Sequence, residues 1–97
     1  MEYNRIITPP KSKFLKSGKV TLEPGEEVGE HITDKREELI ICLKGKATIM
    51  VEGVENVLEE GKGFFIPEEK IHNIFNREDE RLEYIFIVAL FDPENSD

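Results

Sequence analysis

Short β-prone segments separated by turn residues run along the whole of this 97-residue chain. Glycine, proline and charged pairs mark the expected turns, at Ser17-Gly18, Pro24-Gly25, Lys44-Gly45-Lys46, Glu52-Gly53, Glu60-Gly61 and Glu78-Asp79. No long window repeats its apolar side chains with the helical period. Even the charged segment 26–38 contains Gly29 and the β-branched pair Ile32-Thr33, which favour an irregular loop and a strand. The pattern therefore predicts an all-β fold, a sandwich or barrel of antiparallel strands.

The β-prone segments themselves are bounded by these turns. We predict strands over Tyr3–Thr8, Lys19–Leu22, Glu38–Leu43, Ala47–Val51, Val54–Leu58, Gly63–Ile66, Ile71–Phe75 and Leu82–Phe91. The dipeptide Glu52-Gly53 separates two of them and is typical of a tight β-hairpin turn.

The chain has the length of one domain, and we expect that domain to cover residues 1–91. Residues 1–16 form an N-terminal arm in this prediction. Pro9-Pro10 separates its strand from the rest, because proline lacks a backbone donor and favours an extended connector. The arm could lie on its own barrel or cross to a second subunit. Residues 92–97 are polar and acidic and are predicted to be a frayed tail.

Charge limits the partners of this chain. It has 21 acidic and 13 basic side chains, a net charge of −8, which argues against binding to nucleic acid or to an anionic membrane. Five of the bases lie in residues 1–20, beside a single acid, so the remainder of the chain is strongly acidic. The two parts attract each other within one chain or between two. Together with the small size of the domain, this attraction leads us to expect a homodimer.

The single cysteine, Cys42, excludes an intramolecular disulfide, so we expect a reducing, cytoplasmic location. The segment 1–16 has no apolar run typical of a signal peptide. The longest apolar run, Tyr84–Phe91, is far shorter than a membrane span, and we expect no membrane association.

Both histidines of the chain lie in similar settings, just after turn segments and at the start of expected strands. His31 follows Pro24-Gly25, and His72 follows Pro67. Between them Glu38 opens an apolar strand, where a carboxylate is costly unless a partner satisfies it. Two imidazoles and one carboxylate are the donor set of a facial metal site with open coordination positions. A plain buried ion pair between Glu38 and His72 is the alternative interpretation.

The spacing of these residues resembles the two sequence motifs of the cupin family. The first motif of the family is Gly, His, His, Glu and Gly, and this chain has at the same spacing Gly25, His31, Thr33, Glu38 and Gly45. The second motif is Gly, Pro, Gly, His and Asn, and this chain has Gly61, Pro67, Glu69, His72 and Asn76. The resemblance covers just over half of the chain. It implies an antiparallel jelly-roll barrel, with a divalent transition metal (Fe, Mn, Ni or Zn) held by His31, Glu38 and His72.

Two positions depart from the family pattern. Thr33 stands where the family has a second histidine ligand, so one donor is missing, although a threonine hydroxyl can hold a metal-bound water. Glu69 replaces the glycine of the second turn, which must then form without the conformational freedom of glycine or be slightly strained.

Strand alternation predicts the surroundings of the site. If Glu38 points into the barrel, so do Ile40 and Cys42, while Thr33 shares a face with His31 and Ile74 shares one with His72. We therefore expect the pocket lining to be Thr33, Ile40, Cys42 and Ile74. Such a small and mostly apolar lining suits a small organic ligand. Glu37 competes with Glu38 for the ligand role if the register slips by one residue.

Three functions remain open from the sequence. The resemblance implies a metal-dependent enzyme acting on a small organic substrate, of the dioxygenase, isomerase, epimerase or decarboxylase type. Tyr84 is the only aromatic hydroxyl expected near the wall of the site, which indicates simple chemistry. The resemblance equally admits a non-catalytic module that binds a sugar or another small molecule. Because of Thr33, a barrel with a vestigial metal site is the third reading.

Overall fold

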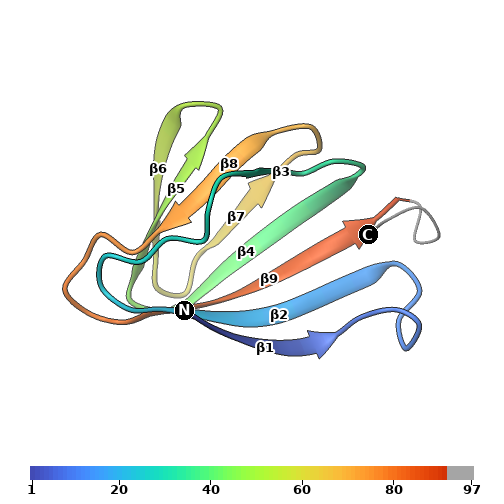
Figure 1. Ribbon diagram of the computed structural model, residues 1–97, viewed down its shortest axis with the longest axis horizontal. Helices are drawn as coiled ribbons and strands as arrows, with labels where there is room; N and C mark the ends of the chain where they lie inside the picture. Colours follow the sequence, from blue (N-terminus) through green and yellow to red (C-terminus); the bar gives the residue numbers. More distant parts are fainter. Residues whose placement is uncertain (92–97) are drawn as a thin grey trace.

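The computed structural model describes residues 1–91 as two antiparallel sheets that pack against each other (Figure 1). In chain order the strands are β1 (Glu2–Ile7), β2 (Leu15–Leu22), β3 (His31–Ile32), β4 (Arg36–Lys44), β5 (Lys46–Val51), β6 (Val54–Glu59), β7 (Gly63–Ile66), β8 (Ile71–Phe75) and β9 (Leu82–Leu90). The five-stranded sheet has the order β1-β2-β9-β4-β7, and the four-stranded sheet has the order β3-β8-β5-β6. This is the all-β jelly-roll architecture that the turn pattern and the motif spacing predicted. The expected tail 92–97 lies outside the described residues.

The core lies between the two sheets and is made by alternating strand positions. Val20, Leu22, Ile40, Ile66 and Leu82 face inward from the five-stranded sheet. The four-stranded sheet contributes Ala47, Ile49, Leu58 and Ile74. Side chains alternate between the two faces of a strand, and β4 shows this most clearly, because it buries Glu38, Ile40 and Cys42 and exposes Glu37, Leu39 and Leu43.

The predicted hairpin is present. β5 pairs with β6 in a register that places Val51 opposite Val54, so Glu52 and Gly53 are the two central turn residues. Both have positive φ, 48° and 78°, as the type I′ turn of a tight hairpin requires. Glycine takes this conformation freely, whereas Glu52 adopts it at a cost in backbone strain.

One predicted turn is wrong. Ser17-Gly18 lies inside β2, which begins at Leu15 rather than at Lys19. The reason is the neighbouring strand β1, whose Tyr3 ring lies over Gly18 and stacks on Phe86. A Cβ atom at position 18 would lie 2.8 Å from Cε2 of Tyr3. The glycine therefore serves close packing of a ring in the sheet rather than a change of chain direction.

The N-terminal arm lies on its own barrel. β1 pairs antiparallel with β2, with Tyr3 opposite Val20. A cis peptide bond joins Pro9 and Pro10 in the connection to β2. Among residues 1–91 no helix has the length and hydropathy needed to cross a bilayer.

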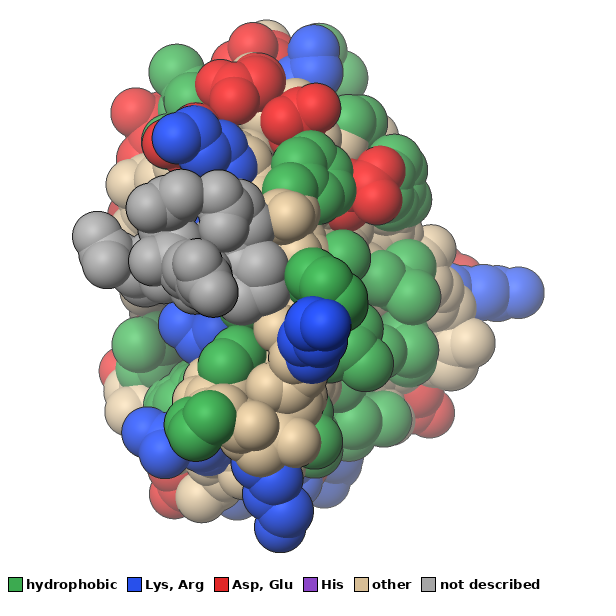
Figure 2. All heavy atoms as spheres, turned by 90° about the vertical axis from the view of Figure 1, so that its right-hand side faces the viewer, with side chains coloured by type: hydrophobic (Ala, Val, Ile, Leu, Met, Phe, Trp, Pro, Cys, Tyr) green, Lys and Arg blue, Asp and Glu red, His purple; other side chains and the backbone are tan. Residues whose placement is uncertain are grey.

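Apolar side chains are also present on the surface. Leu39 and Phe65 are exposed on the outer face of the five-stranded sheet, and they border a shallow groove with Ile87 and Ala89. Figure 2 shows hydrophobic side chains gathered in a band on the face at the right-hand side of Figure 1. Contiguous apolar surface of this kind is typical of association sites.

Candidate metal centre

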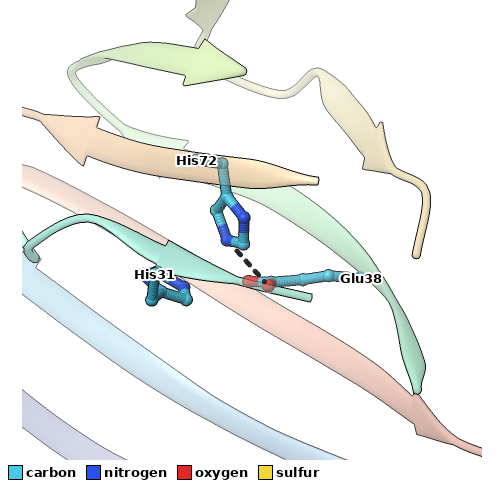
Figure 3. A group of neighbouring side chains, drawn as sticks. All are labelled: His31, Glu38 and His72. Carbon is cyan, nitrogen blue, oxygen red and sulfur yellow. Dashed lines mark ion pairs between the residues drawn. The ribbon is translucent and has the colours of Figure 1, made fainter. Parts of the chain in front are cut away.

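The structure brings together the three residues that the motif spacing singled out. His31 on β3 and His72 on β8 are directly opposite each other in the four-stranded sheet, and their ring centroids are 4.0 Å apart. Glu38 reaches the pair from β4 in the facing sheet (Figure 3). One potential ligand atom from each residue lies within 4.8 Å of the other two. The cluster is therefore compact enough for a single ion.

Backbone carbonyl groups orient both imidazoles. Nδ1 of His31 lies 2.9 Å from the carbonyl oxygen of Gly29, and Nδ1 of His72 lies 3.1 Å from that of Lys70. A carbonyl oxygen only accepts, so Nδ1 carries the hydrogen in each ring and the neutral tautomer leaves a lone pair on Nε2. Such an outer hydrogen bond is the usual way in which a metal-binding histidine is held.

The buried Nε2 atom of His72 has no hydrogen-bond partner among residues 1–91. It lies 3.4 Å from Oε1 of Glu38, and only 1% of His72 is exposed. A lone pair facing a carboxylate in a buried site is unfavourable unless a cation lies between them. A proton or a divalent metal meets that need, and imidazole with carboxylate suits a transition metal. The residues present thus fit the metal that the donor pattern implies.

The same contacts set the protonation of His72. Burial disfavours the charged imidazole, but the Glu38 carboxylate and the Lys70 carbonyl outweigh burial and raise the pKa of His72 above its ordinary value. In the metal-free protein a proton therefore occupies Nε2 more readily than in a free histidine.

Strand alternation resolves the choice between the two neighbouring carboxylates. Glu38 is buried and faces the barrel interior, whereas Glu37 is exposed on the opposite face of β4. β4 pairs with β9 so that Glu38 lies opposite Val88, which also lines the interior. Glu37 therefore points away from the cluster, on the opposite face of β4, and cannot serve as a ligand.

Thr33 lies beside the cluster, but its hydroxyl serves the backbone. The hydroxyl donates to the carbonyl oxygens of Pro67, at 2.7 Å, and Lys70, at 3.3 Å, and it accepts from the Lys70 amide at 3.1 Å. These contacts use the one hydrogen of the hydroxyl and one of its two lone pairs, so the side chain is anchored to the turn before β8. The expectation that this hydroxyl can hold a metal-bound water stays a prediction, since the second lone pair can still accept a hydrogen bond.

The turn held by Thr33 contains the second departure from the family pattern. Glu69 has a φ of 62°, the left-handed conformation that glycine adopts without strain. The amide of Glu69 donates to the Thr33 carbonyl at 2.8 Å. Lys70, the next residue, presents the carbonyl that orients His72. Thr33 therefore fixes the backbone on which the geometry of His72 depends.

The four residues predicted to line the pocket divide into two pairs. Thr33 and Ile74 do line a cavity of about 270 Å³ beside the cluster. Ile40 and Cys42 face the interior as alternation requires, but they are wholly buried in the hydrophobic core and are not part of that lining. They lie further along β4, away from the cluster. Burial raises the pKa of the Cys42 thiol, as expected of a packing residue rather than a ligand.

The rest of the cavity wall was not predicted from the sequence. It includes Lys16 and Arg36 together with apolar and aromatic side chains from both sheets and from the segment before β3; these are Met1, Tyr3, Val20, Val28, Ile32, Phe86 and Val88. The alternation of β2 could have identified Lys16, because it shares a face with Val20 and Leu22. Tyr84 lies in the wall as the sequence suggested, but it is not the only aromatic hydroxyl there, because Tyr3 of β1 also lines the cavity. Burial and the nearby Glu38 charge raise the pKa of the Tyr84 hydroxyl, which stays protonated.

The remaining motif residue, Asn76, has a structural role. Its amide group donates to the carbonyl oxygens of Leu22, at 2.9 Å, and Glu80, at 2.8 Å, and accepts from the Glu78 amide at 3.1 Å. These bonds join the loop after β8 to the end of β2. Asn76 thus supports the barrel and takes no part in the cluster.

A jelly-roll barrel with a His–Glu–His cluster near one cavity defines a class of small barrel proteins. The cupin domain model matches residues 18–88, and the chain belongs to the cupin family. Those residues contain both motifs and every member of the cluster.

Distant relatives agree on this fold. The chain is 27% identical over 79 residues to the polyketide synthase CurC of Streptomyces cyaneus, a match covering 81% of this chain and 51% of that protein. This chain thus spans about half the length of that curated relative. A crystal structure of a Thermus thermophilus protein has a TM-score of 0.84 at 19% identity, covering 93% of this chain and 83% of that one. A predicted oxalate decarboxylase from Thermotoga maritima has a TM-score of 0.74 at 24% identity, covering 77% and 65%.

Proposed function

We propose that this protein binds one divalent transition metal through His31, Glu38 and His72 and acts as a metal-dependent enzyme on a small organic substrate. The observation that carries the proposal is the buried Nε2 of His72, which faces the Glu38 carboxylate at 3.4 Å without a hydrogen bond. The two backbone carbonyls behind the imidazoles support it, because they hold the lone pairs in the ligand orientation.

A metal held by these residues would supply Lewis-acid or dioxygen chemistry, since three protein donors leave coordination positions open. The chain itself binds and orients the substrate in the adjoining cavity, whose wall is mostly apolar. Tyr84 keeps its proton, so it acts as a hydrogen-bond donor and not as a base. The names of the Thermotoga and Streptomyces relatives are consistent with an enzyme.

A non-catalytic binding protein is the second candidate function. It is favoured by the commitment of the Thr33 hydroxyl to the turn, which leaves the cluster with three donors. A barrel of this kind would bind a sugar or another small molecule in the same cavity. Its metal site would be weak or vestigial.

Metal titration separates these functions. Protein stripped with a chelator is titrated with Mn²⁺, Co²⁺, Ni²⁺ and Zn²⁺ by calorimetry, and Fe²⁺ is added under anaerobic conditions. We expect one ion per chain for wild type and none for Glu38→Gln. The matched control is Glu37→Gln, which removes the adjacent carboxylate from the outer face. Equal binding by the two variants, or no binding by wild type, would contradict the metal centre.

A further inference from the structure

We propose that the cavity beside the cluster binds a small organic acid, with the apolar body against the wall and the carboxylate at Lys16. This inference specifies the substrate class of the proposed function. It rests on that function only for the assignment of the metal cluster as the place where the ligand reacts. The observation that carries it is an inward-facing lysine with no anionic partner in a mostly apolar cavity.

The register of the five-stranded sheet places Lys16 in the row of Glu38. Lys16 is opposite Val88 of β9, and Val88 is opposite Glu38 of β4. All three line the cavity. Two strand spacings separate the backbones of Lys16 and Glu38, about 10 Å. The lysine and the cluster are therefore at different points of one cavity, far enough apart for a small molecule to contact both.

The other lysine of the same strand shows why Lys16 is unusual. Lys19 faces outward and pairs with Glu83 at 2.7 Å. No carboxylate among residues 1–91 lies within ion-pair distance of the Lys16 ammonium. Half-burying a cation beside apolar side chains is costly without a counter-charge. A ligand anion supplies that charge.

The charges of the cavity are separated along its wall. The chain as a whole has a net charge of −8, yet Glu38 is the only acid among the described residues that line the cavity, and it belongs to the metal cluster. Lys16 lies on the wall two strands away from Glu38. A metal at the cluster would add further positive charge. The cavity thus favours a negatively charged ligand.

The wall indicates which anion fits. Most of the lining is apolar, and the stacked rings of Tyr3 and Phe86 form one side, with centroids 5.8 Å apart. A lysine is a point charge, and the lining lacks the fork of donors or the helix N-terminus that typically holds a phosphate. A volume of about 270 Å³ limits the ligand to a small molecule. An aryl or branched-alkyl carboxylate satisfies each of these constraints.

Binding by metal-free protein tests the inference independently of the metal centre. The probes are benzoate, its neutral analogue benzamide and inorganic phosphate, each titrated while amide chemical shifts are followed by NMR. We expect benzoate to shift the amides around Lys16 and Val88 and to bind about tenfold more tightly than benzamide or phosphate, as a charge-assisted hydrogen bond predicts.

The variants are Lys16→Met, which keeps the aliphatic stem, and Lys19→Met, the outward-facing control on the same strand. We expect Lys16→Met to weaken benzoate about tenfold and to leave benzamide unchanged, while Lys19→Met retains wild-type binding. Equal binding of benzoate and benzamide, tighter binding of phosphate, or an unchanged Lys16→Met would overturn the inference. Metal binding without benzoate binding refutes the acid site alone, whereas benzoate binding without metal binding refutes the metal centre alone.

Discussion

Replacing Thr33 by valine tests how the barrel positions His72. Valine has nearly the same shape but lacks the hydroxyl, which bonds to Pro67 and Lys70 in the turn before β8. Thr33 is 1% exposed, so water does not readily replace the lost contacts. The Lys70 carbonyl, which accepts from Nδ1 of His72, then loses part of the support that holds it in place.

The expected loss follows from the contacts removed. The Pro67 carbonyl and the Lys70 amide each lose the hydroxyl as a partner. A hydrogen bond contributes about 1 kcal/mol net to stability, so the two lost bonds together account for about 2 kcal/mol. We therefore expect Thr33→Val to lower the free energy of unfolding by about 2 kcal/mol, or the melting temperature by roughly 8–16 °C. Metal affinity should fall about 10- to 100-fold, the usual effect of losing an outer contact of a ligand.

Thermal unfolding of the metal-free protein and calorimetric Zn²⁺ titration measure the two effects. Thr33→Ser keeps the hydroxyl and should bind Zn²⁺ nearly as wild type does. Thr48→Val is the control for a buried threonine, since the structure gives the Thr48 side chain no hydrogen bond with residues 1–91. If Thr33→Val binds Zn²⁺ as tightly as Thr33→Ser, the turn does not position His72 and the reasoning is wrong.

Three further predictions concern acidity, backbone strain and assembly. Burial lowers the pKa of His72, but Glu38 outweighs burial and the pKa is raised above its ordinary value. On acidification, Zn²⁺ affinity should therefore begin to fall already above pH 6.5, because protons compete for the imidazole. The metal-free fold should show the opposite trend and lose stability as the pH rises through that pKa, and both effects are measured across about pH 5–8. In urea unfolding, Gly53→Ala should cost about 1–2 kcal/mol for its φ of 78°, and Gly45→Ala clearly more, because its Cβ would lie 2.6 Å from a carbonyl oxygen. We expect light scattering to give wild type twice the chain mass of 11.2 kDa. Leu39→Glu places a charge on the exposed apolar face of the five-stranded sheet and should give the mass of a single chain. A monomeric wild type would contradict the homodimer.

Most of the fold follows from local patterns in the sequence. Alternation and turn residues located eight of the strands to within a few residues, and the Glu52-Gly53 turn fixed the register of its hairpin. These features depend on neighbours along the chain, so the sequence contains the information directly. Ser17-Gly18 was misread because its glycine is required by the Tyr3 ring, which comes from another strand. A contact between strands leaves no local signal.

The candidate site divides in the same way. Spacing and alternation by themselves predicted that His31, Glu38 and His72 converge on one site, since two ordered motifs fix both the strand and the face of each residue. Only the tertiary structure shows that Glu38 and His72 are buried whereas His31 is exposed. Only the tertiary structure decided that the Thr33 hydroxyl binds the turn. It alone placed Lys16 in the row of Glu38, because that register arises from the pairing of β2, β9 and β4, which are distant in the chain. Alternation gives the face of a strand, whereas the depth of a residue along the barrel depends on the pairing of strands far apart in sequence.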